Sequence, residues 1–281
     1  MFRIGLSSSG KELCPQLFEN YKKAGIDAME LDCAFDSYDA LDYKDVRRMA
    51  DASGVELWSF HLPFRPFDTL DISSSNKEIR EHSLKYTGEL FKKAADIGID
   101  KYVVHSGATF KRVYTELLEE RLKIASESYA YLAEIAGKLG GVVAVENLPP
   151  VCVGTDICEI ERLISLDERL RVCFDTNHMY SGDPADFIRH FGEKIITMHV
   201  SDFDHIKERH WLPGEGKNDW QSIYKAFCDI NYKGPWLYEV QFISLPTIKR
   251  ERDLTCEDFA RNAREIFENN PFTIIPSEKL V

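Results

Sequence analysis

Short runs rich in β-branched and aromatic residues alternate with longer stretches of helical character from one end of the chain to the other. This alternation is typical of βα units that build a parallel sheet. Eight such runs are present, and their lengths and spacing favour a closed barrel. They lie near residues 2–9, 28–35, 55–62, 101–106, 142–148, 170–176, 195–201 and 235–241.

The stretches between the predicted strands carry signals for helix starts and ends. Asn76 and Thr155 precede two helical stretches, and short polar side chains at such positions cap free backbone N–H groups. Gly25 and Gly54 follow two others, and glycine readily adopts the left-handed conformation that often ends a helix. Because no linker interrupts the alternation, we predict one α/β domain over residues 1–281, a single (β/α)8 TIM barrel.

Two connections are longer than the usual loop between a barrel strand and its helix. They cover residues 62–75, after the third predicted strand, and residues 202–219, after the seventh. Long loops in barrels usually build the rim of the active site or a lid over it. We therefore expect both loops at the active-site rim.

The composition is that of a globular protein, with 281 residues, 44% of them hydrophobic and 29% charged. No stretch approaches the roughly 20 apolar residues that span a bilayer, and the amino terminus lacks the pattern of a secretory signal. Seven cysteines are present without a CxxC pair. We therefore expect no membrane association, a cytoplasmic location and reduced thiols.

The formal net charge of −12 narrows the range of partners. Proteins that bind nucleic acid usually carry a basic face that neutralises phosphates. The acidic balance argues against nucleic acid as a partner, although a local basic patch can oppose the sign of the whole chain. We expect a small molecule instead, and a homo-oligomer stays open.

Acidic and histidine side chains follow the predicted strands at the points where the strands end. They are His61, His105, Glu146, Asp175, His199 and Glu239, with His178 three residues beyond Asp175. In a barrel these ends meet at one mouth, which carries the active site. A charge directly after an apolar strand is costly to bury unless it is paired or coordinated. Taken singly, each position is explained equally well by a hydrogen-bonded rim residue.

Four of these residues together favour a metal site. The carboxylates of Glu146, Asp175 and Glu239 would repel each other at one mouth, and a divalent cation would keep them ionised. His199 adds an imidazole nitrogen to the three oxygen donors. Such a set suits Mn²⁺, Mg²⁺ or Co²⁺, and also Zn²⁺. We predict one divalent metal ion bound by these four residues.

Four ordered motifs resemble the xylose isomerase-like barrel superfamily over about residues 2–265. The motifs are Val145-Glu146-Asn147-Leu148-Pro149, Asp175-Thr176-Asn177-His178, Met198-His199-Val200-Ser201-Asp202 and His210-Trp211-Leu212-Pro213-Gly214-Glu215-Gly216. The resemblance implies a metal held by a Glu, an Asp, a His and a second Glu from successive strands. These are Glu146, Asp175, His199 and Glu239 in this sequence.

The resemblance also implies an activity, that of a sugar isomerase or epimerase. In the ketose 3-epimerases the two glutamates move a proton at the carbon next to the carbonyl, so Glu146 and Glu239 are the expected acid/base pair. Such proton transfer needs a positioned base and stabilisation of the enediolate oxygen. His178 matches a family histidine that binds a substrate oxygen, and we expect His61, His105 and His210 to line the same pocket. The substrate would be a sugar, a sugar phosphate or a polyol.

Two departures from the family bear on the alternatives. His205 stands where the epimerases carry an arginine that grips the substrate, which argues against a simple ketohexose. The superfamily also contains zinc-dependent apurinic endonucleases, whose three metal ions use additional histidines that match His61, His105, His178 and His210. Glu208 stands where those nucleases have an aspartate. The alternatives to a sugar isomerase or epimerase are an endonuclease-like phosphodiesterase and a metal-dependent polyol dehydratase. A binding protein that keeps the metal but has no activity is disfavoured, because both Glu146 and Glu239 are present.

The long loop after the third predicted strand contains an arginine between aromatic residues. Arg65 could meet a phosphate or a carboxylate, but a solvated surface position is the more common explanation for an arginine in a loop. Phe64, Phe67, Trp58 and Trp211 could form apolar walls for a sugar, but single aromatic positions more often fill the core.

Overall fold

The computed structural model describes residues 1–107 and 115–280. Residues 108–114 and 281, which the predicted domain includes, lie outside the described residues. Eight parallel strands form the central sheet of the described chain. They are β1 (Ile4–Ser7), β2 (Ile26–Leu31), β3 (Glu56–His61), β4 (Lys101–Val104), β5 (Val142–Glu146), β6 (Arg171–Asp175), β7 (Ile195–His199) and β8 (Trp236–Tyr238). Each predicted strand is therefore confirmed, with bounds that differ by a few residues.

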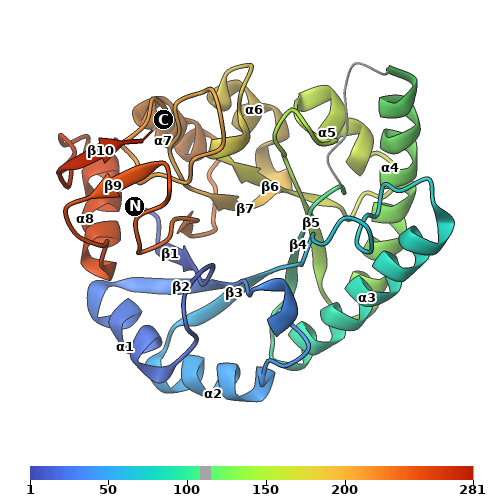
Figure 1. Cartoon of the computed structure of the whole chain (residues 1–281), viewed down its shortest axis with the longest axis horizontal. Helices are drawn as coiled ribbons and strands as arrows, with labels where there is room; N and C mark the ends of the chain where they lie inside the picture. The colour runs from blue at the N-terminus through green and yellow to red at the C-terminus, as the bar shows by residue number, and fades with distance from the viewer. Residues whose placement is uncertain (108–114, 281) are drawn as a thin grey trace.

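Helices connect the strands and surround them, as the view in Figure 1 shows. They are α1 (Pro15–Ala24), α2 (Tyr43–Ser53), α3 (Lys77–Asp96), α4 (Thr115–Lys138), α5 (Ile157–Ile164), α6 (Pro184–Phe191), α7 (Trp220–Asp229) and α8 (Cys256–Phe267). Asn76 caps α3 as predicted, and Gly25 and Gly54 end α1 and α2 in the left-handed conformation. The prediction for α5 was wrong by one residue, because the carboxylate of Asp156 rather than Thr155 caps this helix.

The sheet closes on itself, which confirms the predicted single (β/α)8 barrel. Its strands follow one another in the order β7-β6-β5-β4-β3-β2-β1-β8. Val200 joins the two ends, because its N–H donates to the carbonyl of Leu237 at 2.8 Å and its carbonyl accepts from the N–H of Glu239 at 3.1 Å. Closure brings the carboxyl ends of β5, β6, β7 and β8 to one mouth.

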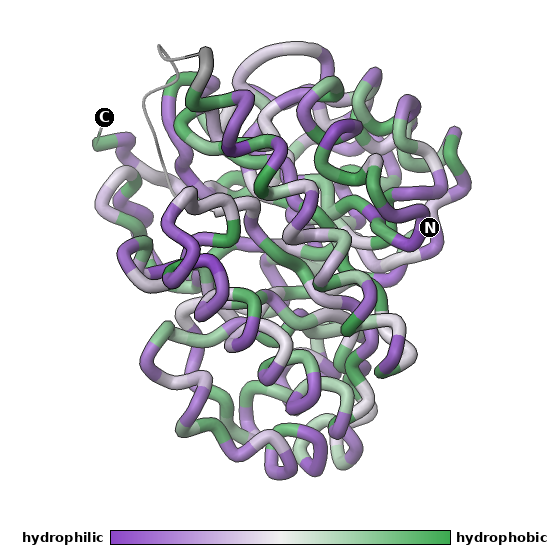
Figure 2. Tube along the Cα trace, turned by 90° about the vertical axis from the view of Figure 1, so that its right-hand side faces the viewer, coloured by the Kyte–Doolittle hydropathy of each residue, from purple (hydrophilic) through white to green (hydrophobic). Residues whose placement is uncertain are grey.

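Apolar side chains fill the space between the strands and the helices. Each helix turns an apolar face inward. Hydrophobic and hydrophilic segments alternate along the tube in Figure 2. Phe18 on α1, Phe91 on α3 and Phe187 on α6 are fully buried. Among the described residues, no helix has both the length and the apolar character that crossing a bilayer requires.

A buried carboxylate organises the long connection between β7 and α7. Asp202 accepts hydrogen bonds from the N–H of Gly214 at 2.8 Å and of Asn218 at 3.1 Å, and from the indole of Trp220 at 2.9 Å. A Cβ atom at Gly216 would lie 2.2 Å from the Asp202 carboxylate, so only glycine permits this approach. The loop is thereby fixed at the mouth of the barrel.

The carboxyl-terminal segment, for which the sequence offered no account, forms a two-stranded ribbon. Ser277–Lys279 (β10) pairs antiparallel with Ile248–Arg250 (β9), in red at the left of Figure 1. The guanidinium of Arg250 donates two hydrogen bonds of 2.8 Å to the carboxylate of Glu215. Both side chains are fully buried, so this pair links the ribbon to the β7–α7 loop.

We predict that Arg250→Met destabilises the protein by about 3 kcal/mol or more, because it leaves the Glu215 carboxylate buried without its partner. The measurement is a urea unfolding curve. Arg189→Met, which removes a pair with Asp229 at the exposed surface, is the control and should leave the midpoint nearly unchanged. Equal midpoints for the two variants would contradict a structural role for the buried pair.

Candidate metal and active site

Glu146, Asp175, His199 and Glu239 converge at the mouth of the barrel. The first three end β5, β6 and β7, and Glu239 directly follows β8. One potential ligand atom from each lies within 4.8 Å of the other three. The side chains of Glu146, Asp175 and His199 are buried, and that of Glu239 is 15% exposed. The four residues predicted as metal ligands are thus brought together.

His199 directs one ring nitrogen at the three carboxylates. Its Nδ1 lies 3.1 Å from Glu146 Oε1, 3.4 Å from Glu239 Oε2 and 3.8 Å from Asp175 Oδ2. Its Nε2 lies 2.9 Å from Oε1 of Glu30, a fully buried residue in β2. A carboxylate at Nε2 favours the proton on that atom, which leaves Nδ1 free to bind a cation.

Asn147 holds the ends of β5 and β6 in register at the site. Its side-chain carbonyl accepts the N–H of Asp175 at 2.7 Å, and its amide donates to the carbonyl of Asp175 at 2.9 Å. Oδ1 of Asp175 in turn accepts the N–H of Asn177 at 2.6 Å. The other oxygen, Oδ2, therefore faces the cluster in a fixed position.

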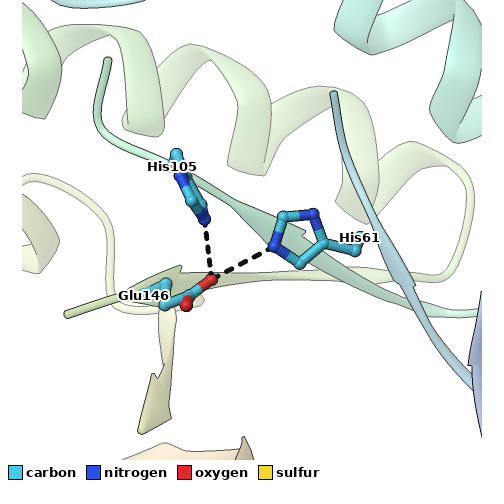
Figure 3. A group of neighbouring side chains, drawn as sticks. All are labelled: His61, His105 and Glu146. Carbon is cyan, nitrogen blue, oxygen red and sulfur yellow. Dashed lines mark ion pairs between the residues drawn. The ribbon is translucent and has the colours of Figure 1, made fainter. Parts of the chain in front are cut away.

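His61 and His105 approach Glu146 from the ends of β3 and β4. Nε2 of His105 lies 3.1 Å and Nε2 of His61 lies 3.4 Å from the same oxygen, Oε2 of Glu146. Figure 3 shows both rings pointing at this carboxylate. The three side chains form a second group within ligand distance.

His178, Glu208 and His210 form a third group of potential ligands on the other side of Asp175. Oε1 of Glu208 lies 2.7 Å from Nε2 of His210 and 3.7 Å from Nε2 of His178. Nδ1 of His178 is 3.2 Å from Oδ2 of Asp175, and Nδ1 of His210 is 3.7 Å from Oε2 of Glu239. The four histidines predicted to line the pocket therefore all contact the acidic residues of the site.

Three of these histidines share one orientation. Nδ1 of His61, His178 and His210 lies 3.0, 2.8 and 3.2 Å from the backbone carbonyls of Leu62, Asn147 and Glu239. A carbonyl can only accept, so Nδ1 donates in each case. The other ring nitrogen, Nε2, points toward Glu146 or Glu208.

The acidic and imidazole groups shift each other's pKa values. Burial alone lowers the pKa of His61, but Glu146 and Asp32 outweigh it and raise the pKa to about 10. Burial and the carboxylates of Glu239 and Glu146 raise the pKa of Asp175 to about 7, against the opposing effect of His178. The metal-free cluster therefore holds protons at neutral pH that a cation would have to displace.

Within the part of the chain that the structure describes, three carboxylate oxygens of the site make no hydrogen bond and are suited to bind a divalent cation. Oε2 of Glu146, Oδ2 of Asp175 and Oε2 of Glu239 are buried and make no hydrogen bond among the described residues. Such carboxylate oxygens, with one imidazole, are suited to a hard divalent ion. Cys173 also lies within reach of Glu146 and His199, but burial raises the pKa of its thiol well above the usual value, which disfavours the thiolate form that binds metals.

Three ionisable residues of the site were missed by the sequence reasoning. Glu30 lies inside β2 and Asp32 directly follows it. The search for charges near strand ends covered only the later strands, and the same search at β2 would have found both residues. Lys11 follows β1 and donates to the carbonyls of Ser9 and Val240 at 3.1 and 3.0 Å. Burial lowers the pKa of Lys11 to about 7, against Asp32 and Glu239, which raise it.

Three further residues considered in the sequence analysis, Trp211, His205 and Phe64, lie in different surroundings. Trp211 is fully buried and donates to Oγ1 of Thr247 at 3.0 Å. His205, at the place of the epimerase arginine, is exposed, and its Nε2 lies 3.0 Å from Oδ1 of Asn218. Phe64, by contrast, stacks on His105 with ring centroids 4.2 Å apart. Of these three residues, Phe64 alone is in contact with the cluster residues named above.

Comparison with known proteins identifies similar chains of several activities. A probable endonuclease 4 of Finegoldia magna is 25% identical over 219 residues, which cover 72% of this chain and 75% of that protein. A fructoselysine 3-epimerase of Escherichia coli O157:H7 is 24% identical over 148 residues, which cover 47% of this chain and 54% of that protein. The chain spans 49% and 65% of the length of the first two curated relatives that it matches.

The fold has counterparts among solved structures. That of a D-tagatose 3-epimerase-like protein superimposes with a TM-score of 0.77 at 20% identity, and the match covers 95% of this chain and 96% of the other. The family whose sequence pattern matches residues 18–257 is described as Xylose isomerase-like TIM barrel. The chain belongs to this xylose isomerase-like TIM barrel family.

Proposed function

We propose that this protein is a metal-dependent isomerase or epimerase of a sugar, sugar phosphate or polyol. The observation that carries the proposal is the convergence of Glu146, Asp175, His199 and Glu239 within ligand distance at the barrel mouth. The similarity to a fructoselysine 3-epimerase and to the D-tagatose 3-epimerase-like structure supports the reaction class. We propose one divalent ion, Mn²⁺, Mg²⁺, Co²⁺ or Zn²⁺, held by these four residues.

Glu146 and Glu239 are the proposed acid/base pair. They come from β5 and from the end of β8, with β6 and β7 between them, and both reach the same nitrogen of His199. A carboxylate on each side of the substrate allows one to remove the proton next to the carbonyl and the other to return it. The cation, when bound, would polarise the carbonyl and hydroxyl oxygens of the substrate.

The histidines around the pair supply hydrogen bonds to the substrate. His61, His105, His178 and His210 each contact an acidic member of the site, so a sugar hydroxyl that enters finds both donors and acceptors. Return of the proton to the original carbon on the opposite face gives epimerisation. Return to the neighbouring carbon gives aldose–ketose isomerisation.

We predict that Glu146→Gln and Glu239→Gln each lower proton exchange at least about 100-fold, because glutamine cannot transfer the proton. The measurement is deuterium incorporation beside the carbonyl, for a panel of keto sugars and keto polyols in D₂O. The metal content of each variant shows whether the cation has been lost, and its circular dichroism shows whether the fold has been lost. If both are unchanged, the lower exchange reports the loss of the acid/base group. Glu168→Gln, on the exposed surface, is the control. Full exchange in either active-site variant would remove that residue from the mechanism.

We predict that divalent-metal affinity rises with pH between 6 and 8. Asp175 has a pKa of about 7, so it holds a proton over part of this range. Burial alone would lower the pKa of His199, but its acidic neighbours raise that pKa well above its usual value. The ion must displace the protons on both residues. Affinity should therefore increase roughly tenfold per pH unit for each proton released. The measurement is calorimetric titration with Mn²⁺ in two buffers of different ionisation enthalpy.

Asp175→Asn is the matched variant for this titration. Asparagine keeps an oxygen donor but has no proton to displace near pH 7, so the pH dependence should become shallower, by about half a proton on average between pH 6 and 8. An affinity that does not change between pH 6 and 8 in the unaltered protein would contradict binding at this cluster.

A second candidate function is an endonuclease-like phosphodiesterase with several metal ions. Two further groups, His61–His105–Glu146 and His178–Glu208–His210, lie within ligand distance, and the similarity to a probable endonuclease 4 supports this reading. The net charge of −12 opposes a DNA substrate. Incision of abasic-site DNA with no exchange in any sugar would favour the phosphodiesterase, and exchange without incision would favour the isomerase or epimerase.

A further inference from the structure

A cavity of about 200 Å³ lies beside the cluster, between the loops that follow β1, β2 and β3. Its wall includes Asp32, Tyr38, Phe64 and Arg65. The cavity adjoins the cluster because Phe64 stacks on His105, and because the hydroxyl of Tyr38 donates to the carbonyl of His61 at 2.8 Å. A second cavity of about 450 Å³ shares Ser9, Asp32 and Cys33 with the first.

Asp32 places a carboxylate in the wall of both cavities. Its backbone is fixed by Ser8, whose Oγ accepts the N–H of Asp32 at 2.8 Å and donates to its carbonyl at 2.7 Å. Oδ1 lies 2.9 Å from the hydroxyl oxygen of Tyr38, whose single proton is shared with the carbonyl of His61. Asp32 is outside the proposed ligand set, and a carboxylate in this position suits the hydroxyl groups of a sugar chain.

Arg65 places a positive charge at the outer part of the smaller cavity. Its guanidinium lies over the ring of Phe64 at 5.3 Å and over that of Phe67 at 5.6 Å. The side chain is exposed and forms no ion pair with a carboxylate among the described residues. Two aromatic rings restrict the guanidinium while its N–H donors stay available.

Arg65 and Arg264 are exposed arginines that form no ion pair among the described residues, and of the two Arg65 lines the cavity beside the cluster. With a net charge of −12, the protein repels anions at long range, and most arginine side chains near the surface are paired with carboxylates. An oriented guanidinium matches the oxygens of a phosphate or a carboxylate with two parallel hydrogen bonds. The cavity thus offers hydrogen-bond acceptors near the cluster and a cation farther out.

We propose that Arg65 binds an anionic group at the end of the substrate remote from the reacting carbon, so that the substrate is a sugar phosphate or a sugar acid. Asp32 accepts hydrogen bonds from the hydroxyl groups between that anion and the cluster. Arg65 is a specificity-determining residue rather than part of the proton transfer. This inference rests on the proposed isomerase or epimerase function.

The experiment compares three ketoses with one carbon skeleton: D-fructose, D-fructose 6-phosphate and D-fructuronate. Deuterium exchange in D₂O gives kcat/KM for each, and the two anionic sugars separate a phosphate from a carboxylate preference. At least one anionic sugar should exceed fructose by about tenfold or more, because a hydrogen-bonded charge pair contributes that much to binding. Arg65→Gln should remove most of this ratio through KM, and Arg65→Lys should restore part of it.

Arg264→Gln, which removes an exposed positive charge from α8, is the matched control and should leave the ratio unchanged. Equal kcat/KM for all three sugars, or a ratio that Arg65→Gln does not lower, would overturn the inference and leave the proposed function in place. If no sugar exchanges, calorimetric binding of fructose 6-phosphate to the unaltered protein and to Arg65→Gln decides the question. If fructose 6-phosphate binds the unaltered protein but not Arg65→Gln, the anion site is supported although the proposed function fails. If it binds both proteins equally, both the anion site and the proposed function are overturned.

Discussion

The structure depends on the cost of burying ionised groups at the mouth of the barrel. Glu146, Asp175 and His199 have almost no contact with solvent. A buried carboxylate is tolerated only when hydrogen bonds, opposite charges or a cation replace its hydration. Burial by itself raises the pKa of Glu146, yet His199 and His105 keep that pKa well below its usual value. Glu146 and His199 therefore stabilise each other's charged forms, whereas burial lowers the pKa of His105 and raises that of Asp175. The backbone around these residues fixes their positions.

The same compensation explains how the surrounding loops are built. Asn147 hydrogen-bonds the end of β5 to that of β6, and Asp202 accepts hydrogen bonds from the β7–α7 loop. Glu30 contacts Nε2 of His199 and so orients its ring. Each of these residues is polar and buried, so its loss would leave a charged or hydrogen-bonding partner unsatisfied. The rigid site thus follows from satisfying buried polar groups. Four of the five groups of potential ligands among the described residues contain Glu146 or His199.

Sequence pattern was sufficient for the barrel and for the main cluster. Eight periodic runs defined the strands, and closure of the sheet necessarily brought Glu146, Asp175, His199 and Glu239 to one end. The orientation of His199 could not be predicted, because it depends on a contact between β7 and β2 that only the folded barrel creates.

Other features escaped the sequence for different physical reasons. The ribbon of β9 and β10 is too short and too exposed in β10 to give a periodic signal. The buried pair of Arg250 and Glu215 joins distant segments, so neither charge alone indicates it. For Arg65, the aromatic neighbours were visible in the sequence, but the cavity beside the cluster was not.

The central claim is that three carboxylates and one imidazole hold one divalent ion. X-ray absorption spectroscopy of the protein loaded with one equivalent of Zn²⁺ tests it directly, because oxygen and nitrogen ligands lie at about 2.0–2.2 Å and sulfur at about 2.3 Å. The account predicts a shell of light atoms with the scattering of a single imidazole. A sulfur ligand, which would point to Cys173, or two or more imidazoles, which would place the ion among the other histidines, would contradict it.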